Sequence, residues 1–214
     1  MILRMLLPLL LHIPKGLKIF EITDIIGIIA FSISGYLIGV RKNLDLLGVI
    51  LSAFLTALGG GIIRDVVANR EIFAFTAVLP GMVVLISVFV SFVFKFHKKE
   101  IENKFLFVVI DTIGLVSFSI SGALVGLNVH FNLLGVMFLA FITSVGGGML
   151  RDMLINEIPF ILIKNFYASV SLIIGFCLYF LKSSPFVVVV IFVLGVTLRL
   201  FAYKKDFHLP KIKI

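Results

Sequence analysis

Two isolated carboxylates stand inside long apolar runs, where a charged side chain is costly. Asp24 and Asp111 each lie near the beginning of a run rich in Ile, Val, Phe, Ser and Gly. Two other apolar runs end in adjacent opposite charges, Arg64 with Asp65 and Arg151 with Asp152. Ionisable side chains at membrane depth face protein or water and commonly mark the path of an ion or substrate. These residues are therefore the first candidates for a site that binds or guides charge.

Each candidate also has a structural interpretation. An Asp near the start of a helix can cap the free N–H groups of the first turn. An Arg near a membrane boundary can snorkel, bind lipid phosphate, or gate a pathway as a movable positive charge. Neighbouring residues on a helix point about 100° apart, so an ion pair within Arg64-Asp65 or Arg151-Asp152 is not assured. We classify the isolated acids as helix-start acids and the paired charges as a charged gate or lipid contact.

Three consecutive glycines precede each charged pair. The triples are Gly59, Gly60 and Gly61 in the first half of the chain and Gly146, Gly147 and Gly148 in the second. A glycine inside a helix costs about 1 kcal/mol relative to Ala, so a repeated triple needs a physical reason. One reason is a bend or break that exposes backbone carbonyls to a water-filled cavity, and the other is a close crossing of two helices. The first predicts a pore bent at the glycines, whereas the second predicts tight packing without a pathway.

Small polar side chains share helix faces with these residues. On a helical wheel, the Ser and Gly residues that follow Asp24 fall within one arc, and those that follow Asp111 do the same. Hydroxyl oxygens can replace the hydration shell of a cation, although small residues also let membrane helices pack closely. The pore-lining candidates are Ser32, Ser34, Thr56, Ser119, Ser121 and Thr143.

The composition excludes a soluble enzyme. The chain has 214 residues, of which 61% are hydrophobic and 14% charged, and its mean hydropathy is +1.23. A soluble domain is about half apolar and a quarter charged, so this chain has too few polar residues to cover a globule in water. The net charge of +8 comes largely from basic residues at the ends of apolar runs, such as Arg41 and Arg199, which indicates membrane topology rather than nucleic-acid binding. A single cysteine, Cys177, and four unclustered His residues predict no metal site and no cofactor.

Apolar segments of about 20 residues predict seven membrane-spanning helices. They lie at about 20–40, 44–63, 73–95, 105–127, 132–150, 160–181 and 185–203. Residues 1–18 contain Arg4 and Pro14 but no small-residue cleavage site, so we expect an N-terminal interfacial arm rather than a signal peptide. Residues 19–204 then form a single membrane domain, and residues 205–214 form a basic C-terminal tail.

The basic residues also predict the orientation of the chain. With seven spans, 13 of the 19 Lys and Arg residues fall on the side of the membrane that holds Arg41-Lys42 and the C-terminus. Positively charged loops face the cytoplasm. We therefore expect a multi-pass protein of the cell membrane with its N-terminus outside and its C-terminus cytoplasmic.

The chain contains an internal repeat. Residues 24–65 align without a gap on residues 111–152, with 22 identities in 42 positions, including the stretches Phe-Ser-Ile-Ser-Gly, Leu-Leu-Gly-Val and Gly-Gly-Gly-x-x-Arg-Asp. The offset of 87 residues contains three predicted spans, an odd number, so the second copy must be inverted in the membrane. This predicts two inverted three-helix repeats, at about 20–96 and 105–182, related by an axis in the membrane plane. The seventh helix, at about 185–203, lies outside the symmetry.

The inverted arrangement also separates the two isolated acids. Asp24 and Asp111 are expected near opposite membrane surfaces, too far apart to share a water as a catalytic dyad. No Ser/His or His/Glu constellation recurs at catalytic spacing. The sequence therefore predicts that the protein is not an enzyme.

Seven spans, two inverted three-span repeats and a Gly-Gly-Gly-x-x-Arg-Asp motif in each half resemble the prokaryotic trimeric intracellular cation (TRIC) channels. The resemblance covers nearly the whole chain, and the doubled motif is specific. It implies a homotrimer in which each subunit carries an hourglass pore, lined by the second and fifth helices and bent at the glycine triples. It also implies that monovalent cations pass, chiefly potassium, with sodium as a further permeant ion. The expected partners are membrane lipids and further copies of the chain.

Three classes of function remain open on these grounds. A channel needs a continuous wet path, an alternating-access transporter needs a closed site and two rocking states, and a structural protein needs neither. The resemblance favours a potassium-permeable channel. Because prokaryotic relatives have also been labelled glycine transporters, the alternative is a secondary transporter of a small solute such as glycine. No potassium-filter sequence such as Thr-Val-Gly-Tyr-Gly is present, so strong selection of potassium over sodium is not expected.

Overall fold

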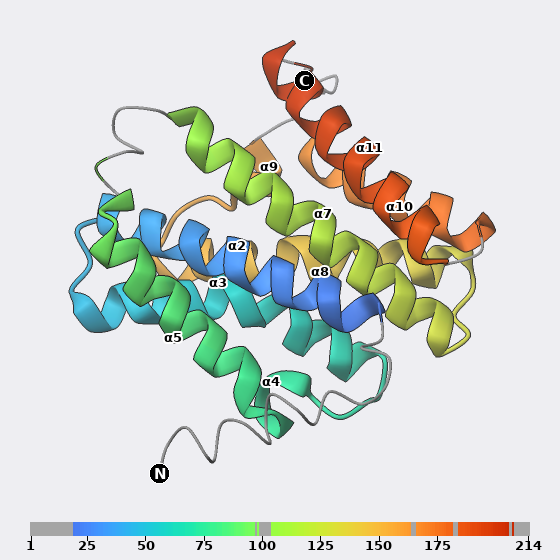
Figure 1. The fold of residues 1–214 in the computed structure, drawn as a ribbon, viewed down its shortest axis with the longest axis horizontal. Helices are drawn as coiled ribbons and strands as arrows, with labels where there is room; N and C mark the ends of the chain where they lie inside the picture. Colours follow the sequence, from blue (N-terminus) through green and yellow to red (C-terminus); the bar gives the residue numbers. More distant parts are fainter. Residues whose placement is uncertain are drawn as a thin grey trace, which may run out of the picture.

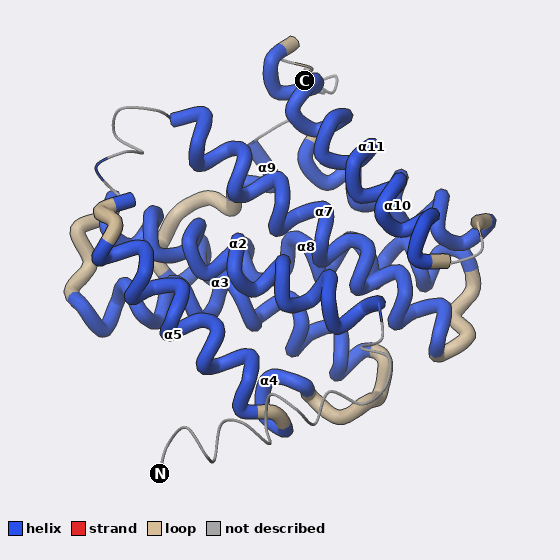
Figure 2. The backbone as a smooth tube through the Cα atoms, in the orientation of Figure 1, coloured by secondary structure: helices blue, strands red, loops and turns tan. Residues whose placement is uncertain are grey.

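The structure is a computed structural model that describes residues 19–96, 98, 104–163, 166–181, 184–205 and 207. Within these ranges every regular element is a helix (Figures 1 and 2). The predicted N-terminal arm, residues 1–18, lies outside the described residues, as do residue 206 and residues 208–214 of the predicted tail. The prediction of an all-helical protein is confirmed for the part of the chain that is described.

The described part contains nine α-helices. They are α2 (Ile19–Arg41), α3 (Leu46–Val67), α4 (Phe73–Thr76), α5 (Val78–Val93), α7 (Lys104–Asn128), α8 (Leu133–Leu154), α9 (Phe160–Ile163), α10 (Tyr167–Phe180) and α11 (Pro185–Lys204). The predicted spans 73–95 and 160–181 are each divided into a helix of four residues and a longer helix. The reason is local backbone conformation, since Ala77 is extended before α5 and Phe166 is left-handed before α10.

Capping side chains explain where three of the long helices begin. Asp45 and Asn132 are the N-cap residues of α3 and α8, and their side chains accept hydrogen bonds from the backbone N–H groups of Gly48 at 2.7 Å and Gly135 at 2.9 Å. Ser184, followed by a proline, caps α11 in the same way. These side chains satisfy N–H groups that have no partner within the helix.

Left-handed residues follow the helices at matching positions in the two halves. Asn43 (φ 54°) and His130 (φ 60°) follow α2 and α7, and Asn69 (φ 49°) and Asn156 (φ 57°) follow α3 and α8. Asn adopts this conformation more readily than most residues. Each pair is 87 positions apart, so the two halves share turn geometry as well as sequence.

Four helices form the centre of the bundle (Figure 1). α2 and α8 each pack against both α3 and α7. α5 lies on α2 and α3, α10 lies on α7 and α8, and α11 packs on α7 and α10. The most apolar stretch of α7 is 72% buried, against 28% for that of α11, because α7 is surrounded by other helices and α11 lies on the outside.

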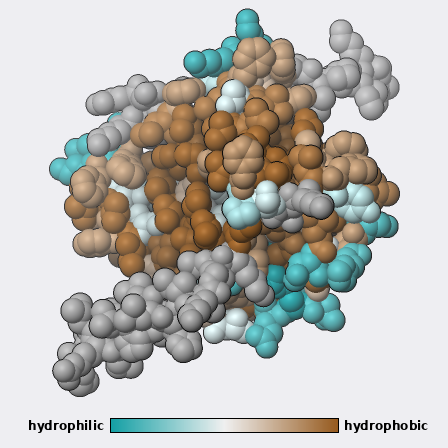
Figure 3. All heavy atoms as spheres, turned by 45° about the vertical axis from the view of Figure 1, so that its right-hand side comes forward, coloured by the Kyte–Doolittle hydropathy of each residue, from teal (hydrophilic) through white to brown (hydrophobic). Residues whose placement is uncertain are grey.

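The outer surface of the bundle is apolar. Large hydrophobic side chains are exposed on the outer helices, among them Phe89 and Phe92 of α5 and Phe186, Val189 and Val193 of α11. Hydrophobic residues cover the middle of the face drawn in Figure 3, and hydrophilic residues lie towards its edges. Within the described ranges, five helices (α2, α3, α7, α8 and α11) are long and apolar enough to cross a membrane, and α5 and α10 are shorter apolar helices. Such a surface suits a lipid environment, as expected for a multi-pass membrane protein.

The glycine triples lie where α3 and α8 cross. Both helices are continuous through the triples, so neither is broken there, and a bend without a break stays a prediction. A Cβ atom on Gly60 would overlap the carbonyl oxygen of Thr143, and one on Gly147 would overlap the carbonyl oxygen of Thr56. Glycine is required at these positions because the two backbones touch. Of the two sequence interpretations, the structure supports the close crossing.

The outer glycines of each triple are less constrained. A Cβ atom on Gly59 would lie 3.0 Å from a side chain of the facing helix, and one on Gly146 would lie 2.9 Å from such a side chain. On Gly61 or Gly148, it would lie 3.8 Å from the guanidinium group of the arginine that follows. Both arginine side chains therefore lie back over the preceding turn of their own helix, as helical side chains commonly do.

Candidate functional site

The first isolated acid and the first Arg-Asp pair meet in a buried cluster, which we call the first charged cluster. It consists of Asp24 (α2), Arg64 and Asp65 (α3) and Ser121 (α7). Arg64 donates from Nη1 to Asp24 Oδ1 at 2.5 Å and to Ser121 Oγ at 2.6 Å, and from Nε to Asp65 Oδ1 at 2.8 Å. Ser121 Oγ donates to Asp24 Oδ1 at 2.6 Å. A buried Arg between two carboxylates is compensated in charge, and here it ties α2, α3 and α7 together.

The segment after α3 holds Asp65 from the outer side. Asp65 Oδ2 accepts a hydrogen bond from the backbone N–H of Phe73 at 3.0 Å, and Arg70 Nε lies 3.6 Å from Asp65 Oδ1. The Arg70 guanidinium lies over the ring of Phe20, with Cζ 4.8 Å from the ring centroid. The chain between α3 and α4 therefore helps to close the first charged cluster.

The second half of the chain forms a matching cluster with a different pattern of bonds, which we call the second charged cluster. It consists of Asp111 (α7), Arg151 and Asp152 (α8) and Ser34 (α2). Arg151 binds Asp152 Oδ1 from Nε at 2.9 Å and from Nη2 at 2.8 Å, and Ser34 Oγ donates to Asp111 Oδ1 at 3.3 Å. Among the described residues, no ion pair joins Arg151 to Asp111, and the buried Nη1 of Arg151 has no hydrogen-bond partner. The second cluster thus lacks the central bond of the first.

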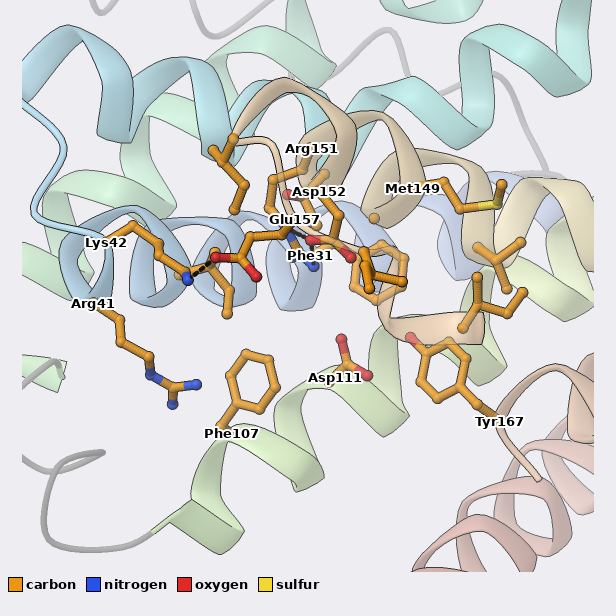
Figure 4. A pocket seen from close by; sticks show the side chains of 17 residues that line it. Phe31, Arg41, Lys42, Phe107, Asp111, Met149, Arg151, Asp152, Glu157 and Tyr167 are labelled. Atoms are coloured by element: carbon orange, nitrogen blue, oxygen red, sulfur yellow. Dashed lines mark hydrogen bonds and ion pairs between the residues drawn. The ribbon is translucent and has the colours of Figure 1, made fainter. Parts of the chain in front are cut away.

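Two residues that the sequence did not single out adjoin the second charged cluster. The Tyr167 hydroxyl of α10 is directed at Asp111 and is its hydrogen-bond partner (Figure 4). Arg199 of α11 is 4% exposed, and its Cζ lies 5.1 Å from the centroid of the Tyr167 ring. Arg199 is therefore buried among the helices rather than exposed at the surface of the bundle. The sequence held a signal for this, because Arg199 lies inside the predicted span 185–203 rather than beyond it.

The two charged clusters face cavities of very different size. The second cluster, without Ser34, lines a cavity of about 290 Å³ together with Tyr167, and we call this the large cavity. The first cluster, without Ser121, lines a cavity of about 10 Å³, which we call the small cavity. A space of about 10–15 Å³ accommodates one water molecule. The large cavity therefore has room for a hydrated ion or a small solute, whereas the small cavity is nearly closed.

The cavities lie towards opposite ends of the bundle. Arg41, at the C-terminal end of α2, lines the large cavity, and Asp24, near the N-terminal end, lines the small one. The stretch of α2 between these residues is about 25 Å long at 1.5 Å per residue. A path that joined the two cavities would therefore run through most of the length of the bundle.

Charged residues also stand at the mouth of the large cavity (Figure 4). Lys42, just after α2, forms an ion pair with Glu157, just after α8. Arg41 Cζ lies 5.3 Å from the centroid of the Phe107 ring. Asp111 projects into the cavity from α7, opposite the Arg-Asp pair of α8. An ion that entered here would pass these charged groups within a lining that is otherwise largely apolar.

Two phenylalanines lie between the cavities. Phe31 of α2 lines the large cavity and Phe118 of α7 lines the small one. Their ring centroids are 5.3 Å apart and the rings are inclined by 48°. Phe31 packs against Gly114, and Phe118 packs against Gly27. These residues occupy equivalent positions of the internal repeat, 87 residues apart.

The predicted pore-lining hydroxyls occupy three kinds of place. Thr56 lines the large cavity. Ser34 and Ser121 each bond the isolated acid of the other half. The remaining three are buried, line neither cavity and donate to the carbonyl four residues earlier in their own helices: Ser32, Ser119 and Thr143.

Both arginines of the repeated motif lie away from the lipid-facing surface. Arg64 is 1% exposed and Arg151 is 5% exposed. Each forms an ion pair with the Asp that follows it, although the helix turns by about 100° between them. Among the roles that the sequence left open, a charge that gates a pathway is compatible with this burial, and neither side chain is exposed where it would bind lipid phosphate.

Comparison with known protein sequences points to one family. The family model described as "Glycine transporter" matches residues 21–97 and 108–183. The chain is 33% identical over 196 residues to the UPF0126 membrane protein YvgT of Bacillus subtilis (strain 168), with 89% of this chain and 95% of that protein covered. It is 34% identical over 150 residues to a UPF0126 membrane protein of Deinococcus radiodurans, with 66% of each protein covered.

Comparison with solved structures points to the same fold. A chain described under "Structural basis for conductance through TRIC cation channels" is similar with a TM-score of 0.80 and 35% identity, and the match covers 92% of this chain and 98% of that one. The TRIC trimeric intracellular cation channel orthologue from Rhodobacter sphaeroides is similar with a TM-score of 0.79 and 25% identity, over 88% of this chain and 98% of that one. The resemblance to TRIC channels noted in the sequence is confirmed.

Proposed function

The chain belongs to the family described as "Glycine transporter", and from this membership and its likeness to solved TRIC cation channels we propose that it is a channel for monovalent cations. The matched family and the matched structures are transport proteins, and the chain is not an enzyme. The observation that carries the proposal is the presence of two cavities towards opposite ends of the bundle, each lined by a buried isolated acid.

The charge of the two clusters favours cations. Each cluster combines two carboxylates with one guanidinium group, so each has a formal charge of −1. Carboxylates in a narrow, low-dielectric cavity attract cations. In the large cavity, Arg41, Lys42 and Arg151 balance Asp111, Asp152 and Glu157, so the attraction is local to the carboxylates and does not come from a net charge of the cavity. Asp111 is the acid best placed for this role, because no arginine is bonded to it among the described residues.

The path that we propose joins the large cavity to the small one between the four central helices. Residues of α2 and α7 line it together with residues of α3 and α8, since each cavity takes its isolated acid from α2 or α7. This differs from a pore made by α3 and α8 bent at the glycine triples, because at the triples those two helices touch. Conduction requires the rings of Phe31 and Phe118, which lie between the cavities, to separate.

We propose further that the halves are inverted repeats within seven spans, with α4–α5 and α9–α10 serving as the third and sixth. The matched turns, the matched clusters and the reciprocal packing of Phe31 on Gly114 and Phe118 on Gly27 support this relation. The distribution of Lys and Arg favours a cytoplasmic C-terminus, which makes the large cavity the cytoplasmic one.

We also propose a homotrimer that conducts potassium and, with little discrimination, sodium. The support for the trimer is that the similar R. sphaeroides structure is described as trimeric. Weak selectivity follows from a lining of scattered hydroxyls and carboxylates rather than a ring of backbone carbonyls. Membrane lipids are the expected partners of the exposed apolar surface.

One observation favours a second candidate, a secondary transporter of a small zwitterion such as glycine. In the large cavity, the unbonded Nη1 of Arg151 and the carboxylate of Asp111 offer partners for a carboxylate and an ammonium group. One open and one nearly closed cavity is also the arrangement that alternating access requires. A channel and a transporter differ in whether both ends can be open at once.

Flux measurements on the purified full chain in liposomes separate these functions. Under a potassium gradient, we expect efflux in the wild type and at least several-fold slower efflux in Asp111→Asn. The matched control is Asp45→Asn, which makes the same chemical change at the N-cap of α3, where the second half of the chain uses Asn132 for the same bond. Slowing of equal size in both variants would contradict a role for Asp111 in attracting the ion.

The same liposomes test the transporter. Counterflow of labelled glycine across vesicles that show no potassium efflux would establish the second candidate. Potassium efflux without glycine counterflow would exclude it.

A further inference from the structure

The aromatic pair between the cavities has the position of a barrier. Phe31 and Phe118 are 2% and 1% exposed, and each ring forms part of the wall of a different cavity. With ring centroids 5.3 Å apart, the pair lies in contact between the two cavities. On the basis of the proposed cation path, we propose that these two rings form its gate, closed while the rings touch and open when they separate.

The chemistry of the pair suits a gate. The nearest charged groups are on the cavity sides of the rings, in the two charged clusters, and the contact itself is between two apolar rings. A hydrophobic constriction excludes water, and a cation cannot shed its hydration shell there because no oxygen replaces the lost water. The rings therefore stop ions without any charged residue in the contact.

The glycines opposite the rings determine how the gate closes. Each ring packs onto a helix position that has no side chain, Phe31 onto Gly114 and Phe118 onto Gly27. A Cβ atom would overlap the Phe31 ring at Gly114, whereas at Gly27 it would lie 3.1 Å from the Phe118 ring. The two glycines thus let both rings reach the centre of the bundle, and the fit is tighter for Phe31.

The unequal cavities indicate which ring moves. The Phe31 ring borders a space of about 290 Å³, whereas the Phe118 ring borders one of about 10 Å³. A ring can swing only into space that is not filled by protein atoms. Phe31 is therefore the movable element, and it opens the path by turning into the large cavity.

Single-channel recording of the full chain in planar bilayers tests the gate. Phe31→Ala and Phe118→Ala are each expected to raise the open probability about tenfold, because the contact between two rings contributes on the order of a tenfold factor to the closed state. Gly114→Ala is expected to raise it as well, because the added methyl group displaces the Phe31 ring without shortening it.

Two controls make the same chemical changes away from the gate. Phe138→Ala removes an exposed ring on α8 that lines neither cavity, and Gly81→Ala adds a methyl group where nothing lies within 4 Å. Both are expected to conduct like the wild type. Should the alanine variants fail to fold, Phe31→Leu and Phe118→Leu replace each ring by a smaller apolar side chain that leaves less empty space. A smaller increase in open probability is then expected.

The outcomes distinguish the gate from the proposed function. A conducting wild type with folded gate variants of unchanged or lower open probability would overturn the gate and leave the channel standing. A wild type that never conducts, with gate variants that are equally silent, would overturn both.

Discussion

Removal of the carboxylate of Asp24 should destabilise the protein much more than the same change at Asp111. The two residues are equivalent in the repeat, but Asp24 accepts bonds from Arg64 Nη1 at 2.5 Å and from Ser121 Oγ at 2.6 Å, whereas Asp111 Oδ1 accepts one bond from Ser34 at 3.3 Å. Loss of one partner from a buried ion pair costs about 3–5 kcal/mol. Because Arg64 retains its ion pair with Asp65, we expect Asp24→Ala to lower the free energy of unfolding by about 3 kcal/mol, at the low end of this range.

The comparison variant, Asp111→Ala, loses the long hydrogen bond from Ser34 and the hydrogen bond from Tyr167, for which we expect about 1–2 kcal/mol in total. The resulting difference of about 1–2 kcal/mol is measurable as a shift between the two thermal unfolding curves. Circular dichroism of the purified proteins in detergent suits this chain, because the described part is helical and the chain contains no Trp for fluorescence.

A double variant shows whether the loss arises from the ion pair. Asp24→Leu combined with Arg64→Met removes both charges, and we expect it to be more stable than Asp24→Ala because no buried charge is left without its partner. Equal destabilisation by Asp24→Ala and Asp111→Ala, or a larger effect at Asp111, would refute the reasoning from the two bonding patterns.

Three further predictions concern the surroundings of the clusters. Gly60→Ala should lower the free energy of unfolding by about 1–3 kcal/mol, or prevent α3 from packing on α8, because the added methyl group meets a carbonyl of α8. Gly61→Ala should leave stability unchanged or raise it. Thermal unfolding compares the two variants, and equal stability would contradict the close crossing. Ser121→Ala should lower the free energy of unfolding by about 2 kcal/mol and Ser34→Ala by at most about 1 kcal/mol, because only Ser121 binds both members of an ion pair. A larger loss for Ser34→Ala in thermal unfolding would contradict this expectation. Lys42→Ala should change the free energy of unfolding by less than about 1 kcal/mol, because its ion pair is solvent-exposed. A larger loss in thermal unfolding would show that this ion pair stabilises the mouth of the large cavity.

The pattern of apolar residues in the sequence predicts much of the fold. Apolar runs of membrane length predict the long helices, and the repeat predicts that the halves are built alike, which the matched N-caps Asp45 and Asn132 bear out locally. The division of two predicted spans into short and long helices was not predictable from hydropathy. It depends on the backbone conformation of Ala77 and Phe166, and neither residue type has a strong turn preference.

The members of the two charged clusters were candidates in the sequence, but the adjoining Tyr167 was not, and the bonds between them were not predicted. A helical wheel shows that Asp24 and the serines share a face, but it does not show that Ser121 of the other half completes the cluster. The glycine triples were compatible with a bend or a crossing, and the contact with α8 that shows the crossing depends on how the two helices pack. Arg199 was grouped with the basic residues at the ends of apolar runs, and its burial depends on the packing of α11 against α7 and α10.

The difference between the two charged clusters lies beyond any sequence argument. Their motifs are the same in the aligned stretch, yet Arg64 is bonded to its isolated acid and Arg151 is not. The shared residues are joined differently because their neighbours differ: Arg70 adjoins the first cluster, whereas Tyr167 and Arg199 adjoin the second. The cavities that the two clusters line differ in size as well.

Single-channel recording of the wild-type chain in planar bilayers, first under a potassium gradient and then with sodium in place of potassium, is the measurement on which the proposed function depends most. We predict unitary current steps that reverse near the potassium equilibrium potential and persist, with little change in size, in sodium. Absence of steps together with counterflow of labelled glycine in liposomes would contradict the cation channel and establish a transporter.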